Sequence, residues 1–110
     1  MAIDREVYLD NAATTSVDPL VAEEMASIIR NDYGNPSALY SLGEVAKNYV
    51  IEAKDRIAGT LGCSPNEIYF TSGGSESDNW AIKGIADIYS GRGNHIVTTA
   101  IEHKAVLKSC

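Results

Sequence analysis

The stretch IYFTSGGSESDN, residues 68–79, decides the fold of this chain. Its first part, Ile68–Thr71, is short, apolar and rich in β-prone residues, which predicts a buried strand. Residues 72–75 form a glycine-rich turn, and a helical pattern follows from Glu76. A strand that leads through such a turn directly into a helix is typical of α/β proteins.

The residues that follow complete a repeating unit. The helical pattern runs from Glu76 to about Tyr89, a second turn occupies residues 90–94, and His95–Thr99 again has the composition of a strand. Strand, helix and strand in this order predict a βαβ unit with parallel strands and therefore an α/β fold. A further helix is expected near His103. The helix residues expected to be buried are Trp80, Ala81, Ile85, Ile88 and Tyr89.

Two helices are predicted before this unit. Asp18 followed by Pro19 is a helix start, and the helix should run to about Arg30. Ser41 and Glu44 have the spacing of a capping box, and the helix behind them should stop at Gly62. The apolar residues expected to be buried on these two helices are Leu20, Val21, Met25, Ile28, Ile29, Leu42, Val45, Ala46, Tyr49, Val50, Ala53, Ile57 and Leu61.

At its C-terminal end the sequence predicts the opening of another helix. Residues 105–110 resemble the opening of a helix that has neither a cap nor a return strand. Two parallel strands cannot cover both of their faces and both of their edges. We therefore expect the 110 residues to be the incomplete front part of a larger α/β protein, either cut or completed by a partner polypeptide.

Composition excludes several classes of function. Nine basic and fifteen acidic residues give a formal charge of −6, and the cations are spread along the chain, so a nucleic-acid binder is not expected. Short apolar runs and a charged start predict neither a membrane span nor a signal peptide. Cys63 and Cys110 lie far apart without metal-ligand spacing. This predicts no metal site and two reduced, buried thiols in a cytoplasmic protein.

The glycine turn is the strongest candidate for chemistry. Glycines allow a ligand to approach the backbone closely, and the first N–H groups of a helix attract an anion such as phosphate. The alternative is a simple capped turn, in which Ser75 is the N-cap and Asp78 the acid of a capping box. The turn matches neither a Walker loop nor a GxGxxG fingerprint.

Other polar segments have weaker signals. His103 follows the second predicted strand, on the same edge as the glycine turn, where it could stack on a flat cofactor, move a proton or be an ordinary surface histidine. His95 opens a strand and is expected to serve packing or edge structure. Residues 10–15 and 35–37 could line a site or form ordinary turns.

In this order, the segments resemble the start of cysteine desulfurases, which are class V pyridoxal-phosphate enzymes of fold type I. Several motifs match in register, over nearly the whole chain. They are YLDNAATT (8–15), GNPS (34–37), EIYFTSGGSESDN (67–79), AIKG (81–84), HIVTT (95–99) and EHKAVL (102–107). Ala38 and Tyr40 depart from the family pattern, which often has serine and histidine there.

The resemblance implies an architecture and a set of site residues. Residues 16–110 would begin a mostly parallel, three-layer α/β large domain, and residues 1–15 would form an N-terminal arm on the small-domain side. Gly74 and Ser75 would hold the cofactor phosphate, and His103 would stack on its ring and act as the catalytic proton carrier. Asn11, Ala12, Ala13 and Thr14 would lie near the substrate, with Asn35 close to the active site and dimer contacts.

The resemblance also implies a reaction, and it implies that some residues needed for this reaction are absent from the segment. The complete enzyme would convert L-cysteine to L-alanine, leave persulfide sulfur on a cysteine and pass it to an acceptor scaffold, as a homodimer or with a separate C-terminal partner. The Schiff-base lysine and the sulfur-accepting cysteine would lie beyond this segment, and Lys104 is not that lysine. The isolated fragment is therefore expected to be inactive. Alternatives are another class V enzyme, such as a selenocysteine lyase or an aminotransferase, and a non-catalytic partner-binding module.

Overall fold

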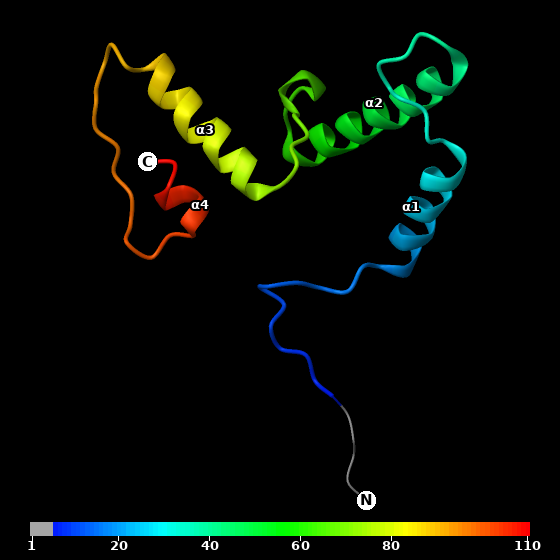
Figure 1. Ribbon diagram of the computed structural model, residues 1–110, viewed down its shortest axis with the longest axis horizontal. Helices are drawn as coiled ribbons and strands as arrows, with labels where there is room; N and C mark the ends of the chain where they lie inside the picture. Colours follow the sequence, from blue (N-terminus) through cyan, green and yellow to red (C-terminus); the bar gives the residue numbers. More distant parts are fainter. Residues whose placement is uncertain (1–5) are drawn as a thin grey trace, which may run out of the picture. The chain divides into compact units, whose positions relative to one another are not determined.

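The computed structural model describes residues 6–110. The chain divides into two compact units, one ending at Pro65 and one running from Asn66 to Cys110, and each is described by itself. The elements along the chain are α1 (Pro19–Asn31), α2 (Ser41–Leu61), the 3₁₀ turn η1 (Pro65–Glu67), α3 (Gly74–Ile88) and α4 (Lys104–Leu107) (Figure 1).

The start of α1 confirms its predicted cap. The side chain of Asp18 accepts a hydrogen bond from the Leu20 N–H at 2.8 Å, and Pro19 takes the first helical position. Proline is suited to that position because it has no N–H to leave unsatisfied. The helix ends at Asn31, one residue beyond the predicted Arg30.

The end of α2 is also as predicted, but its start is not. Gly62 adopts a left-handed φ of 70°, and its N–H donates to the carbonyl of Ala58. The N-cap is Tyr40 rather than Ser41, and it makes no side-chain cap hydrogen bond. The Gly43 and Glu44 N–H groups both donate to the Tyr40 carbonyl, at 2.9 and 3.1 Å, so the helix begins before a capping box at Ser41 can form.

The loop between α1 and α2 lies directly against the first turn of α2. A Cβ atom on Gly43 would collide with the carbonyl of Ala38 and stand 2.7 Å from the carbonyl oxygen of Asn35. A Cβ atom on Gly34 would likewise collide with the carbonyl of Leu42. Both positions therefore require glycine, because only a residue without a side chain permits this approach between the two backbones.

The two predicted strands do not form among the described residues. Residues 68–71 and 95–99 have no assigned strand, and the regular elements of residues 6–110 are all helical. A strand needs the hydrogen-bond ladder of a neighbouring strand on its edges, and no strand is assigned within residues 6–110 to pair with either segment. The expectation of an α/β unit is thus not met by these residues alone.

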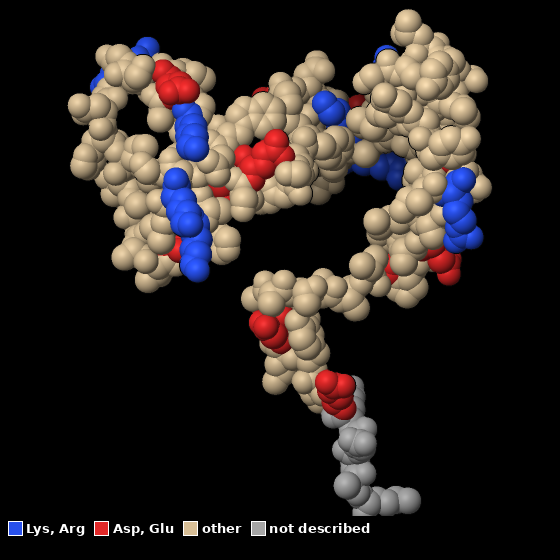
Figure 2. Space-filling view, in the orientation of Figure 1, with Lys and Arg blue, Asp and Glu red and all other residues tan. Residues whose placement is uncertain are grey.

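Most helix residues that were predicted to be buried are exposed, whereas Ala46 is buried as predicted. Within residues 6–110 the buried apolar residues are Ala46, Ala58 and Ile68, a very small core. By contrast, Leu20 on α1 is 75% exposed and Trp80 on α3 is 55% exposed. In Figure 2 uncharged surface surrounds a few separate charged side chains on the visible face of each unit. Burial was predicted from helical periodicity, which identifies an apolar face but does not supply a partner to cover it.

The cysteines differ from their expected environment. Cys63 is half-buried and Cys110 is exposed, so the prediction of two buried thiols is wrong. Within residues 6–110 no group of three His, Cys, Asp or Glu side chains is arranged to hold a metal ion. None of the helices in that range combines the length and the hydropathy needed to cross a bilayer.

Candidate functional site

The start of α3 leaves backbone donors free in the glycine turn. The helix begins at Gly74, two residues before the predicted Glu76, because the N–H groups of Glu76 and Ser77 both donate to the Gly73 carbonyl, at 3.1 and 3.2 Å. Among the described residues, no protein acceptor receives the N–H groups of Gly74 and Ser75. Two adjacent donors at a helix start favour an anion.

The alternative of a turn capped by Ser75 and Asp78 is wrong. The N-cap is Gly73, which is extended (φ 161°) and makes no side-chain cap hydrogen bond. Ser75 is exposed and lies inside the first helical turn, so its hydroxyl is not used to cap the helix. The hydroxyl and the free N–H groups of Gly74 and Ser75 are therefore available on the same short segment.

The carboxylate of Glu76 also restrains the glycine turn, through hydrogen bonds to Ser72. The Glu76 Oε2 atom accepts hydrogen bonds from the Ser72 N–H at 2.6 Å and from the Ser72 hydroxyl at 2.7 Å. The backbone bond and then the side-chain bond from Ser72 lower the pKa of Glu76 below its ordinary value. Sequence reasoning missed this contact, although Glu76 stands three residues after Gly73, where a capping box has its acid.

Thr71 adds a second restraint. Its hydroxyl lies 2.7 Å from the Ser77 hydroxyl and 3.2 Å from the Gly73 carbonyl oxygen. The segment that enters the turn is therefore tied to the first turn of α3 at two places, through Ser72 and through Thr71.

His103 has a fixed place at the start of α4. It is the N-cap, and its Nδ1 atom accepts a hydrogen bond from the Ala105 N–H at 3.1 Å. An accepting Nδ1 leaves Nε2 as the nitrogen that carries the proton in the neutral ring. Just before it, the Thr99 hydroxyl donates to Glu102 Oε1 at 2.9 Å and closes the loop. The prediction of a helix near His103 is confirmed.

The candidate residues fall into two groups. Gly74, Ser75 and His103 all belong to the second unit, in which α3 and α4 pack against each other (Figure 1). The other group belongs to the first unit. There the N–H groups of Ala13 and Thr14 donate to the Asp10 carbonyl at 3.1 and 3.4 Å, so residues 11–13 form a turn.

Asn35, also in the first unit, organises its own loop. Its Oδ1 atom accepts a hydrogen bond from the Ser37 N–H at 2.9 Å, and its carbonyl accepts one from the Ala38 N–H at 2.9 Å. This is an Asx turn, in which the side chain acts as part of the backbone. The side chain of Asn35 is thus already engaged within its loop.

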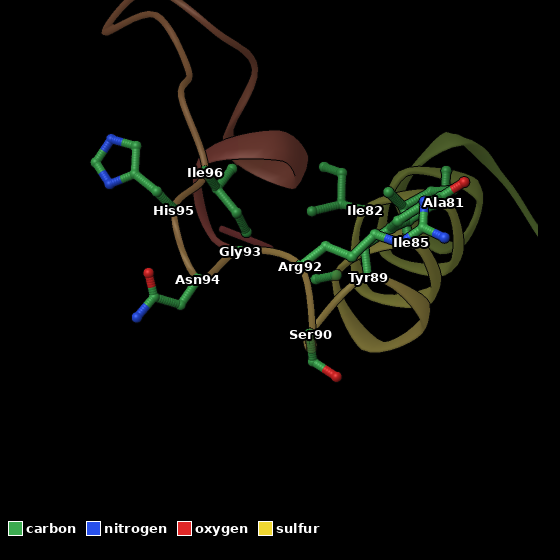
Figure 3. A pocket seen from close by; sticks show the side chains of 11 residues that line it. Ala81, Ile82, Ile85, Tyr89, Ser90, Arg92, Gly93, Asn94, His95 and Ile96 are labelled. Atoms are coloured by element: carbon green, nitrogen blue, oxygen red, sulfur yellow. The ribbon is translucent and has the colours of Figure 1, made fainter.

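A hollow of about 750 Å³ opens beside the end of α3 (Figure 3). It lies between Ile82, Ile85 and Tyr89 of the helix and Ile96 of the segment that follows. The Arg92 guanidinium lies over the Tyr89 ring, 5.5 Å from its centre. His95 is exposed, and its ring points away from the α3 side chains in Figure 3, so of the two expected roles, packing and edge structure, packing against α3 is not seen.

Comparison with known proteins gives a consistent set of matches. Residues 7–110 match the family described as aminotransferase class-V. A cysteine desulfurase IscS of Methanosarcina thermophila is 50% identical over 107 residues, which make up 97% of this chain and 26% of that protein. A cysteine desulfurase IscS of Dictyoglomus turgidum is 46% identical over 106 residues, covering 96% of this chain and 27% of that protein.

A solved structure adds a likeness in three dimensions. A NifS-like protein superposes with a TM-score of 0.88 at 46% identity, and the match covers 96% of this chain and 29% of that one. The chain spans about a quarter of the length of the relatives it matches.

Proposed function

The chain belongs to the aminotransferase class-V family, and from this premise we propose that it is the first part of a pyridoxal-phosphate-dependent cysteine desulfurase. The complete enzyme would release L-alanine from L-cysteine and keep the sulfur as a persulfide for transfer to an acceptor scaffold. The names of the relatives support this proposal, since two that are 50% and 46% identical are cysteine desulfurases.

One structural observation carries the assignment of the cofactor site. The N–H groups of Gly74 and Ser75 have no acceptor among the described residues, and they begin a helix of 15 residues. A Cβ atom placed on Gly73 or Gly74 would meet nothing within 4 Å, so the turn is open to a ligand. Free amides, a free hydroxyl and the positive end of a helix dipole suit the phosphate group of pyridoxal phosphate.

In this enzyme each candidate residue of the chain would have its own role. Gly74 and Ser75 bind the phosphate and orient the cofactor, which supplies an electron sink for the substrate when bound. His103 covers the ring and moves a proton at Nε2, because its Nδ1 is occupied by the Ala105 N–H. The segments Asn11–Thr14 and 35–37 line the substrate side. The Schiff-base lysine and the sulfur-accepting cysteine come from polypeptide beyond these residues.

The proposal extends to the fold. Residues 16–110 would begin the large domain, and residues 1–15, of which 1–5 lie outside the described residues, would form an N-terminal arm on the small-domain side. Residues 68–71 and 95–99 pair as parallel strands once further strands lie beside them, and a homodimer completes the enzyme. The superposition with the NifS-like protein supports this proposal because it extends over 96% of the chain.

The function can be tested in a chimera that joins residues 1–110 to the part of the M. thermophila desulfurase that they do not match. With a thiol reductant present to release the persulfide sulfur as sulfide, we expect this chimera to form alanine and sulfide from L-cysteine, and we expect the 110-residue chain alone to form neither. His103→Ala should lower the rate roughly a hundredfold or more, as loss of a general acid–base group does.

The controls distinguish the desulfurase reaction from the related reactions of other class V enzymes. Asp87→Ala changes a carboxylate at the far end of α3 and should leave the rate of the chimera unchanged. A folded, cofactor-loaded chimera that released alanine only from selenocysteine would assign the lyase reaction instead. One that released alanine from neither substrate would overturn the proposal.

A further inference from the structure

We propose that Glu76 is a positioning residue, whose side chain holds the glycine turn in the shape that presents the Gly74 and Ser75 amides to a phosphate group. The inference rests on the proposed function, since it assigns a role in that same site. Glu76 does not itself face the ligand as a donor, because an ionised carboxylate can only accept hydrogen bonds.

The turn needs hydrogen bonds of this kind because side-chain packing does not hold its two glycines, and Glu76 adds its bonds to those that the Gly73 carbonyl receives from Thr71 and Ser77. Gly73 and Gly74 have no side chains, and no atom lies within 4 Å of where their Cβ atoms would be. Glycine also loses more conformational freedom on ordering than any other residue. Packing therefore does not fix these two residues, and the hydrogen bonds that flank them do.

Glu76 supplies two of those hydrogen bonds through a single oxygen. Its Oε2 atom accepts the Ser72 N–H at 2.6 Å and the Ser72 hydroxyl at 2.7 Å, which spans the two glycines from one side to the other. Hydrogen bonds to an ionised carboxylate are shorter and roughly twice as strong as neutral ones. The lowered pKa of Glu76 is consistent with these two contacts.

Two effects of the carboxylate oppose each other. Its charge repels a phosphate that binds at the same helix end, whereas its hydrogen bonds keep the phosphate donors in place. Glu76 is exposed, so water and salt weaken the repulsion. The hydrogen bonds are local and directional, and we expect them to outweigh it.

The test compares two substitutions in the chimeric enzyme described above. Glu76→Ala removes the acceptor and should weaken pyridoxal-phosphate binding about tenfold, with no change for pyridoxal, which lacks the phosphate. Glu76→Gln keeps an acceptor of the same length and removes the charge, so its dissociation constant should stay within about threefold of the parent. Asp87→Ala is the matched control for losing one negative charge from α3.

Amide hydrogen exchange gives a readout that does not depend on activity. Without cofactor, exchange at Ser72 and Ser77, whose N–H groups donate to Glu76 and to the Gly73 carbonyl, should speed up in Glu76→Ala and not in Glu76→Gln. If Glu76→Ala does not fold, Ser72→Ala tests the same contact by removing one of its two donors and should weaken binding by about threefold.

The outcomes separate this inference from the proposed function. A parent chimera that binds no pyridoxal phosphate would overturn the proposed function. If the parent binds it and Glu76→Ala binds equally well or more tightly, Glu76 does not position the turn. Equal losses for pyridoxal and pyridoxal phosphate would also overturn the role, because they would show a general change in the pocket.

Discussion

The carboxylate of Glu76 stabilises the start of α3 and also repels an anion bound there. At the first turn of α3 its charge interacts favourably with the helix dipole, and its oxygen accepts two hydrogen bonds from Ser72. The same charge stands beside the amides that we assign to a phosphate. A residue with these two effects makes the shape of the turn depend on pH.

The pH dependence has a definite sign. Because the pKa of Glu76 is lowered in the folded chain by the Ser72 hydrogen bonds, its contribution to stability is present above the ordinary glutamate pKa. That contribution is lost as the pH falls through the lowered pKa of the folded state. Carbon NMR of the Glu76 carboxyl should show a pKa below the ordinary glutamate value.

A matched variant checks this interpretation. In Ser72→Ala one of the two hydrogen bonds is gone, so the carboxyl of Glu76 should titrate closer to its ordinary value. If the carboxyl of Glu76 titrates at the ordinary glutamate pKa in the parent chain, the contact with Ser72 is contradicted.

Single residues also show which local signals can be read from sequence. Asp18 and Pro19 were predicted as a helix start and form one, because a cap depends on only a few neighbouring residues. Ser75 was predicted as one possible N-cap and is not, because the chain reaches helical geometry at Gly74. Two glycines in a row allow several starts, and local sequence does not choose among them.

Among the elements, α2 offers a test of the packing between a helix and its preceding loop. Gly43 and Gly59 lie in the same helix, but a Cβ atom at Gly43 would stand 2.7 Å from the Asn35 carbonyl oxygen, and one at Gly59 would meet nothing within 4 Å. Gly43→Ala should lower the free energy of unfolding by about 1–3 kcal/mol through overpacking. Gly59→Ala should raise it by about 0.5–1 kcal/mol.

Urea denaturation followed by circular dichroism would measure both changes in the chimera. The opposite signs are the point of the comparison, because both substitutions add the same methyl group to the same helix. Equal effects of the two substitutions would mean that the loop containing Asn35 does not rest on α2.

The contrast between helices and strands explains how far prediction from sequence reached. Each helix makes its own hydrogen bonds, so a repeat of three or four residues and a cap were enough to locate α1, α2 and α3 within two residues. The segments 68–71 and 95–99 have strand composition, but a strand makes its hydrogen bonds to other segments. The composition of a segment therefore indicates that it can form a strand, but it does not show whether a neighbouring strand is present to pair with it.

At the scale of the whole molecule, the candidate site was predictable only in part. Its residue types and their order could be read from the sequence, including Gly74, Ser75 and His103. The contact between Ser72 and Glu76 could not, since it depends on where the helix starts. The exposure of the apolar helix faces could not be predicted either. Helical periodicity shows which face of a helix is apolar, but it does not show whether another segment covers that face.

The exposed apolar residues predict how the isolated chain behaves. Leu20 and Ile29 on α1 and Ile85 and Ile88 on α3 are each more than half exposed. Extended apolar surface of this kind promotes association in water. Light scattering after size-exclusion chromatography should show species larger than 11.8 kDa that grow with concentration.

Two further measurements, at high salt and in the completed chain, test whether the exposed apolar surface causes this association. Apolar association should persist in about 1 M sodium chloride, where the Debye length is about 3 Å. The 1–110 segment within the chimera should lose this tendency. A strictly monomeric 110-residue chain at high concentration would contradict the prediction.

The edge-to-face pair of Tyr69 and Trp80 gives the chain a built-in optical probe. The ring centres are 5.2 Å apart with an interplanar angle of 69°, and Trp80 is the single tryptophan of the sequence. Half-exposed indole emits at long wavelength, so a shift to the blue would report the moment when neighbouring polypeptide covers α3. A bound chromophore that absorbs in this range would quench the same emission, and one fluorescence trace could then follow assembly and cofactor loading without any added label.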